Sequence, residues 1–186
     1  MRPHPFRPLT DPEYAFLTRH FPTDAPRRRG RPPTDLRRTL DAIFWIACST
    51  APWRDLPEQY GRPDTASRQL RRWARSGQMD HLLALVAART PEDEILNALA
   101  WRICRAWRRI SRIVGLKSLV RAKNAGLRAA LPAEPRWLPD PILSEIAHSL
   151  VAKSLKSTLT QPPGTFSALA GLMRAAGGNR RRWRLK

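Results

Sequence analysis

The sequence predicts an all-α protein. Apolar residues recur at every third or fourth position through most of the chain, as they do on one face of a helix. No segment shows the alternation of apolar and polar residues that is typical of a half-buried strand. Many of the 18 prolines and 9 glycines lie where a helical pattern stops. The order of the segments favours a helix-turn-helix-type small helical domain followed by a basic helical domain.

The chain is strongly basic: its 186 residues include 34 Lys and Arg against 15 Asp and Glu, a net charge of +19 at pH 7. This balance favours nucleic acid or an anionic membrane surface as the partner, because neutralising phosphates releases their counterions. No apolar stretch is long enough to span a bilayer, and the first residues lack the apolar segment of a signal peptide. Cys48 and Cys104 lie in apolar helical contexts, which indicates buried free thiols, and the histidines lack metal-ligand spacing. We therefore expect a cytoplasmic, nucleoid-associated protein with no metal site and no cofactor.

The first 33 residues are predicted to contain one short helix and a linker. The helix at 11–20 begins at Thr10 or Asp11, either of which is a suitable N-cap. Residues 22–33 are rich in proline and arginine, which predicts an extended basic linker. Its Arg-Gly-Arg-Pro run resembles the core of an AT-hook, in which arginines enter a narrow minor groove, and the alternative is a solvated linker. The residues expected to contact DNA in this way are Arg28, Arg29 and Arg31.

Proline and glycine divide the next segment into a series of helices. Thr34 or Asp35 is the predicted cap of the first helix. Asp64 or Thr65 is the predicted cap of a basic helix that stops at Gly77. The expected elements are helices at residues 34–50, 53–60, 65–76 and 78–89, with a turn at 61–64. A helix, a short helix, a turn and a basic helix in this order are typical of a helix-turn-helix.

The predicted basic helix carries arginine on one face and apolar residues on the other. Its arginines fall at i, i+3, i+4 and i+7, so a helix stacks them along one stripe. They are Arg68, Arg71, Arg72 and Arg75. A polyanion would offset the repulsion among four like charges, whereas the alternative is a solvated face on a structural helix. We expect Arg68 and Gln69 to reach base edges, and Arg72 and Arg75 to contact phosphates.

The second half of the chain is also predicted to be helical and basic. The helix at 91–114, with Thr90 as its cap, places five arginines opposite its apolar residues. These arginines are Arg102, Arg105, Arg108, Arg109 and Arg112. We expect them to form an outer face that adds nonspecific DNA affinity, although such a face also suits a membrane or a partner protein.

Three further helices are expected at 116–131, 142–159 and 166–176. The apolar seam predicted for the second of these consists of Ile142, Ile146, Leu150 and Leu159. The predicted divisions of the chain are a DNA-binding domain at 1–89, a basic helical domain at 90–179 and a basic tail at 180–186.

Motifs in the first half of the chain resemble a known protein family. The residues that carry the resemblance are Leu9-Thr10-Asp11, Phe21-Pro22, Gly30-Arg31-Pro32, Arg37, Leu40-Asp41-Ala42-Ile43, Trp53-Arg54-Asp55-Leu56-Pro57, Tyr60-Gly61, Leu70-Arg71-Arg72-Trp73 and Gly77. In order and spacing they are similar to the N-terminal insertion-element domain of bacterial insertion-sequence transposases of the DDE class, over about residues 9–86. The resemblance implies a helical module that grips transposon ends. It also implies a ribonuclease-H-like catalytic domain after that module, with three metal-binding carboxylates.

The chain departs from this family in several places. Tyr14 stands where tryptophan is usual, and Ala51-Pro52 replaces a turn that usually contains glycine. The acidic residues after residue 90 are Glu92, Asp93, Glu94, Glu134, Asp140 and Glu145, and none of them ends a predicted strand. Two-metal chemistry needs carboxylates that converge on both ions, which a sheet would supply. The sequence therefore predicts no DDE catalytic core of its own and no enzymatic activity.

The main hypothesis is a DNA-binding protein derived from an insertion-sequence transposase, which binds double-stranded DNA at transposon ends through the arginine-faced helix. A second hypothesis is an accessory subunit of a two-frame transposase that is active with a separate catalytic chain. A third is a basic amphipathic protein that binds an anionic membrane or a protein partner through the helix of Trp101 and Trp107. The main hypothesis expects no membrane contact.

Overall fold

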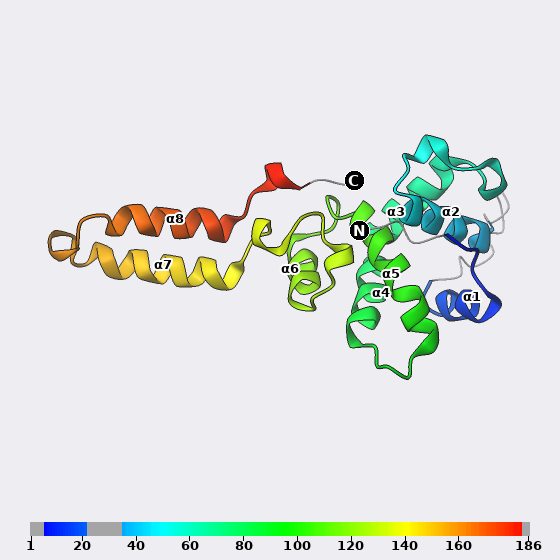
Figure 1. Ribbon diagram of the computed structural model, residues 1–186, viewed down its shortest axis with the longest axis horizontal. Helices are drawn as coiled ribbons and strands as arrows, with labels where there is room; N and C mark the ends of the chain where they lie inside the picture. The colour runs from blue at the N-terminus through cyan, green and yellow to red at the C-terminus, as the bar shows by residue number, and fades with distance from the viewer. Residues whose placement is uncertain (1–5, 22–34, 184–186) are drawn as a thin grey trace. The chain divides into compact units, whose positions relative to one another are not determined.

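The computed structural model describes residues 6–21 and 35–183, and within these ranges it contains helices and no strand (Figure 1). The prediction of an all-α protein is therefore confirmed. The α-helices are α1 (Asp11–Thr18), α2 (Leu36–Ser49), α3 (Pro63–Arg75), α4 (Gln78–Ala88), α5 (Glu94–Arg109), α6 (Leu116–Asn124), α7 (Pro141–Leu155) and α8 (Thr165–Gly177). Short 3-10 turns connect them: η1 (Trp53–Asp55), η2 (Glu58–Tyr60), η3 (Arg128–Ala130), η4 (Pro135–Trp137), η5 (Thr158–Thr160) and η6 (Arg180–Arg182).

The chain forms two compact units, which divide between Leu131 and Pro132 rather than at the expected position of residues 89 and 90. The difference arises because α5 packs against both α2 and α4 and so belongs to the core of the first unit. Trp107 of α5 is fully buried there, and its indole Nε1 donates a hydrogen bond of 2.8 Å to Oδ1 of Asp80 in α4. The segment after residue 90 thus completes the first unit instead of starting a second.

Helix α2 lies at the centre of the first unit. The sequence spacing predicts an apolar stripe of Leu36, Leu40, Ile43, Phe44 and Ala47. The last four are buried, whereas Leu36 in the first turn is only half-buried, and Ala42, Ile46 and Cys48 on the other sides of the helix are buried too. Burial on several sides follows because α3 and α5 both pack on this helix. Asp35 is the N-cap, accepting a hydrogen bond from the backbone nitrogen of Arg38 at 3.1 Å.

Several helix ends differ from the predictions. Helix α5 begins at Glu94, and Thr90 is not its cap: Oδ2 of Asp93 accepts the backbone N–H of Thr90 at 2.8 Å and folds residues 90–93 into a turn. Helix α3 begins at Pro63, so neither Asp64 nor Thr65 is its cap: the N-cap is Arg62, which makes no side-chain capping bond. Proline suits the first helical position because its missing N–H would have no partner within the helix. The expected helix at 116–131 ends at Asn124, before Gly126 turns the chain with a φ of +67°.

The second unit is built on α7 and α8, which lie side by side as an antiparallel pair (Figure 1). The apolar seam predicted for 142–159 is wrong: Ile142 is 65% exposed and Leu159 fully exposed, and Ile146 and Leu150 are also exposed. The side chains buried between the helices are Ala147, Leu169 and Ala176. Small side chains let the two backbones approach, so the contact lies on the alanine side of α7.

The two cysteines are free and buried, as predicted. Burial raises the pKa of both thiols, that of Cys104 to about 11. Because the thiolate is the reactive form, we expect neither cysteine to react with a disulfide reagent near pH 8 in the folded protein, and both to react after unfolding in denaturant. A colorimetric thiol count before and after unfolding measures this. Stoichiometric labelling of Cys104 without unfolding would contradict the packing of α5.

Gly61 ends the turn before α3 in a conformation that only glycine adopts readily, with φ of +88° and ψ of −163°. A Cβ atom at this position would lie 3.3 Å from Nε of Arg38. Replacing Gly61 by Asn should therefore lower the free energy of unfolding by about 1–3 kcal/mol in urea titrations.

The matched control is Gly77→Asn at the end of α3. Gly77 has φ of +81° and ψ of −1°, a left-handed helical conformation that asparagine tolerates, and a Cβ there would meet nothing within 4 Å. We expect a clearly smaller loss for this variant. Equal losses of unfolding free energy in the two variants would show that neither the nearby Arg38 nor the ψ of Gly61 causes the effect.

Candidate nucleic-acid interface

Helix α3 rests on the first unit through one apolar side, as predicted. The buried residues of that side include Ala66, Leu70, Trp73 and Ala74. The ring of Phe21, which follows α1, packs on the indole of Trp73 with the centroids 4.1 Å apart. The sequence context favours Trp53 and Trp73 as packing anchors of the basic helix. Trp73 is buried and is such an anchor, whereas Trp53 in η1 is only half-buried. These contacts fix which side of α3 faces solvent.

The opposite side of α3 carries the predicted stripe, and all four of its arginines are exposed. Gln69 is half-buried, and its Oε1 accepts a hydrogen bond from Nη1 of Arg72 at 3.1 Å. No carboxylate of residues 6–21 or 35–183 forms an ion pair with an arginine of the stripe. An open hollow lies between these side chains, lined by Arg68, Arg71, Arg72, Arg75 and Ser76. The guanidinium groups of the stripe can therefore donate hydrogen bonds to an anionic ligand.

The segment between α2 and α3 is held by Arg38. Its Nε donates to the carbonyl of Gln59 and its Nη2 to the carbonyl of Glu58, both at 2.9 Å. Leu56 of the Trp-Arg-Asp-Leu-Pro run is buried, while Arg54 and Asp55 are exposed. The run thus forms η1 and leads into η2, where the expected short helix at 53–60 is replaced by two 3-10 turns. This connection sets where α3 begins.

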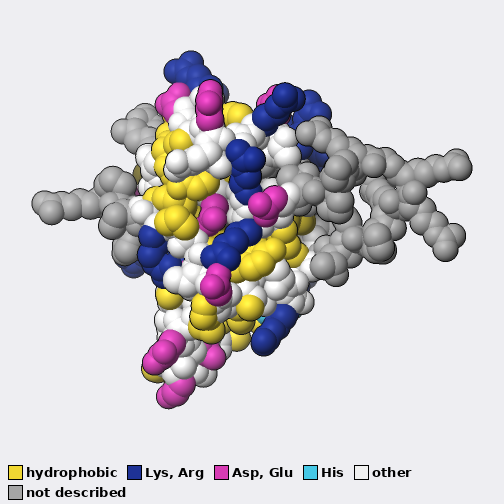
Figure 2. Space-filling view, turned by 90° about the vertical axis from the view of Figure 1, so that its right-hand side faces the viewer, with side chains coloured by type: hydrophobic (Ala, Val, Ile, Leu, Met, Phe, Trp, Pro, Cys, Tyr) yellow, Lys and Arg dark blue, Asp and Glu magenta, His cyan; other side chains and the backbone are white. Residues whose placement is uncertain are grey.

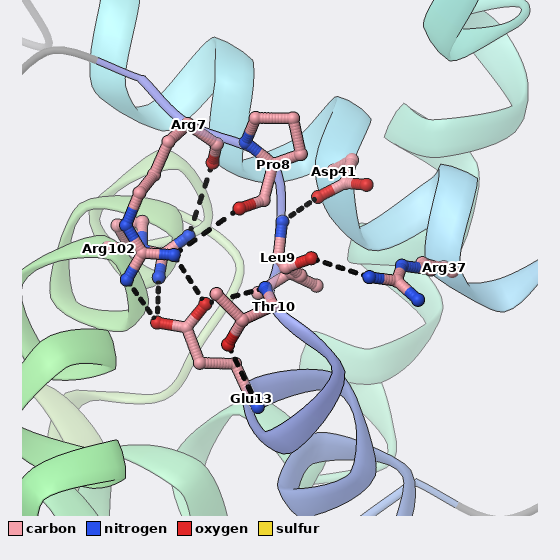
Figure 3. Close-up of polar contacts among 8 residues, drawn as sticks. All are labelled: Arg7, Pro8, Leu9, Thr10, Glu13, Arg37, Asp41 and Arg102. Atoms are coloured by element: carbon pink, nitrogen blue, oxygen red, sulfur yellow. Dashed lines mark hydrogen bonds and ion pairs between the residues drawn. The ribbon is translucent and has the colours of Figure 1, made fainter.

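Glu13 of α1 is the centre of a buried polar network (Figure 3). Its carboxylate accepts hydrogen bonds from Arg7 at 2.6 and 2.8 Å, from Nη2 of Arg102 at 2.5 Å and from the backbone N–H of Thr10 at 2.9 Å. Burial alone would raise the pKa of Glu13, but the hydrogen bonds from Arg7 and Thr10 and the charge of Arg102 hold the pKa below its ordinary value. Thr10 is the N-cap of α1 and forms a capping box with Glu13.

The same segment is tied to α2 by the residues of the sequence motif (Figure 3). Oδ1 of Asp41 accepts the backbone N–H of Leu9 at 2.8 Å, and Arg37 donates to the carbonyl of Leu9 at 2.7 Å and to Asp11 at 2.6 Å. Burial raises the pKa of Asp41, against the hydrogen bond from Leu9 and the charges of Arg37 and Arg102. The Leu-Thr-Asp motif therefore fixes α1 on α2 and α5.

The prediction that the arginines of α5 form an outer face is wrong for three of them. Arg102 is only 6% exposed and pairs with Glu13. Nε of Arg105 donates to the carbonyl of Ala47 at 3.3 Å. Arg109 donates to the carbonyl of Ile46 at 3.1 Å and also to that of Ala51. These carbonyls lie at the C-terminal end of α2, where the helix dipole is negative and carbonyls lack helical partners, so α5 caps α2 with cations.

The three linker arginines that are expected to contact DNA, Arg28, Arg29 and Arg31, lie outside the described residues. On the face drawn in Figure 2, Lys and Arg side chains are interspersed with Asp and Glu and with apolar area, so the net charge does not form a continuous basic surface there.

In the described part of the chain, no helix is both long and apolar enough for a membrane crossing, and no three His, Cys, Asp or Glu residues are arranged to hold a metal ion.

Comparison with known proteins agrees with the resemblance found in the sequence. Residues 9–83 match the model of a family described as "Putative transposase of IS4/5 family". A Sinorhizobium fredii (strain NBRC 101917 / NGR234) protein titled "Uncharacterized protein y4sN" is 37% identical over 79 residues, which are 42% of this chain and 62% of that protein. No solved structure matches the chain. The predicted resemblance over about residues 9–86 is confirmed, since residues 9–83 are similar to that putative transposase family.

Proposed function

We propose that the chain binds double-stranded DNA through the exposed arginine stripe of α3, as the end-binding part of an IS4/5-type transposition system. The observation that carries the proposal is the division of α3 into two sides. The apolar side is buried in the first unit, and the stripe is exposed without a carboxylate partner among the described residues. Counterion release from DNA favours the meeting of such a stripe with phosphates.

The arrangement around α3 supports a helix-turn-helix reading. Helix α2 packs on α3, η1 and η2 lie between them in the chain, and α4 follows α3 directly after Gly77. In this reading α3 is the recognition helix, and Arg68 and Gln69 in its middle read base edges in the major groove. Arg72 and Arg75 bind phosphates and set the register.

The membrane alternative loses one of the two tryptophans that led to it, and the other, Trp101, is half-buried. Trp107 has no exposed surface and donates its indole N–H to Asp80, so α5 does not present it to a lipid surface. Arg102, Arg105 and Arg109 of the same helix bind groups of the first unit. Helix α3 is therefore the better supported binding element.

Selection of bound duplexes from a random pool, followed by salt titration of the recovered sites, tests the proposal. With six to ten phosphate contacts, affinity should fall by about 10³ to 10⁵ between 50 and 200 mM salt. Recovered sites should share a core sequence when base edges are read. A binding curve that does not change with salt would contradict the proposal.

A further inference from the structure

A second cationic site lies in the second unit, outside the residues that match the transposase family. Two half-buried tryptophans have guanidinium groups over their rings: Arg136 and Arg182 over Trp137 at 4.9 and 5.4 Å, and Arg180 over Trp183 at 5.5 Å. We call these residues, together with the exposed Arg181 between Arg180 and Arg182, the arginine–tryptophan cluster: Arg136, Trp137, Arg180, Arg181, Arg182 and Trp183. It joins η4, which precedes α7, to η6, which follows α8.

The cluster is built by specific backbone contacts. Nε1 of Trp183 donates to the carbonyl of Trp137 at 3.1 Å, and the same carbonyl accepts the backbone N–H of Asn179 at 2.9 Å. The side chain of Asn179 caps η6 by accepting the backbone N–H of Arg181 at 3.1 Å. Residues 179–183 therefore dock on η4 in one register.

Gly178 makes this docking possible. Its φ is +70°, and a Cβ atom there would lie 2.7 Å from the carbonyl oxygen of Trp137 and 2.8 Å from the carbonyl carbon of Leu138. Both are backbone atoms, which cannot move aside as a flexible side chain does. Alanine at position 178 would therefore separate η6 from η4 without changing the charge of the chain.

The cations of the cluster are incompletely neutralised. Arg136 pairs with Glu134 at 2.8 Å, with both side chains mostly exposed. Arg180, Arg181 and Arg182 are exposed, and the carboxylates that the structure describes form no ion pair with them. Holding these charges together costs electrostatic free energy, which the ring contacts offset only in part.

We propose that the arginine–tryptophan cluster is a second DNA contact, which binds phosphodiester groups of the duplex backbone. The inference rests on the proposed function, because it adds a contact to the same DNA-bound state. Arginine on an aromatic face is held in place at low entropic cost and still donates N–H groups to phosphate oxygens. The indole rings carry guanidiniums and the indole N–H of Trp183 is already bonded, so an anionic lipid surface is the less favoured partner.

The test compares full-length variants for duplex binding over a range of salt. The charge variant R180Q/R181Q/R182Q should bind at least tenfold more weakly at 0.1 M salt, with a log–log salt slope smaller by about 2 to 3. Gly178→Ala retains every charge, yet it should weaken binding several-fold because the cations disperse. Gly171→Ala is its matched control, since Gly171 lies inside α8 with nothing within 4 Å of the new Cβ, and it should bind like the original protein.

Each outcome has a separate meaning. If the charge variant lost affinity and Gly178→Ala did not, the proposal of a structured site would be overturned. Residues 180–182 would then bind DNA through their charge alone. Unchanged DNA binding in both variants, together with loss of binding to vesicles that contain phosphatidylserine, would overturn it in favour of a membrane. Failure of the proposed function is a different result, in which loss of the α3 stripe leaves DNA binding intact. Circular dichroism of Gly178→Ala, compared with the charge variant, shows whether α7 and α8 remain folded.

Discussion

Replacing Arg68, Arg71, Arg72 and Arg75 by alanine should lower the affinity for duplex DNA by about three to four orders of magnitude at 0.1 M salt. This expectation follows because each phosphate contact contributes roughly 0.9 of a power of ten at that salt concentration, and four cations are removed. Helicity should be unchanged, since all four side chains are exposed and alanine is the best helix former. Fluorescence anisotropy with a labelled duplex, alongside circular dichroism, measures both quantities.

The control for this variant removes the same charge elsewhere in the first unit. Four exposed cations away from α3 serve this purpose: Arg19, Arg112, Lys117 and Arg128. Their replacement by alanine should cost less than tenfold, because distant charges are screened at this ionic strength. If both variants lost affinity equally, net charge rather than α3 would account for binding.

The orientation of α3 could be predicted from the sequence because it depends on local spacing. Arginines at i, i+3, i+4 and i+7 share one side of any helix, and Leu70 and Trp73 then point away from them. The same spacing argument identified the central apolar residues of α2, such as Leu40 and Phe44. In both cases the residue types alone distinguish the buried side from the exposed one.

The arginines of α5 show where this reasoning stops. A helical wheel places Arg102, Arg105 and Arg109 on one polar side, but it does not distinguish water from the carbonyl end of another helix. Their partners are a carboxylate 89 positions away in the sequence and carbonyls about 60 positions away. Only the tertiary packing of α5 on α2 reveals that these cations are internal.

The prediction of which residues of α7 pack against α8 failed for a related reason. The large residues Ile142 and Ile146 form a convincing helical seam in the sequence, yet the structure packs the side of Ala147 instead. The arginine–tryptophan cluster was also missed, because Trp137 and Trp183 are 46 positions apart. The positive φ of Gly178, which sequence does not reveal, brings them together.

Glu13→Ala should destabilise the first unit by about 3–5 kcal/mol, the usual cost of removing one partner from a buried ion pair. Arg102 would keep its charge at 6% exposure without the carboxylate, and the capping box of α1 would also be lost. Denaturant titration of the full chain measures the change. The matched control is Asp55→Ala, which breaks an exposed pair with Arg54 and should cost about 0–1 kcal/mol.

The pH dependence of stability separates the charge of Glu13 from its packing. Because the pKa of Glu13 is lower in the folded protein than the ordinary value of 4.5, its ionised form contributes stability that is fully present above pH 4.5. That contribution is lost as the pH falls through the lower folded pKa. Glu13→Gln keeps the size of the side chain but cannot ionise, so the stability difference from the original protein should be large at pH 7 and shrink towards acid. A difference that stayed constant down to pH 3 would show that Glu13 acts through packing and not through its ion pair with Arg102.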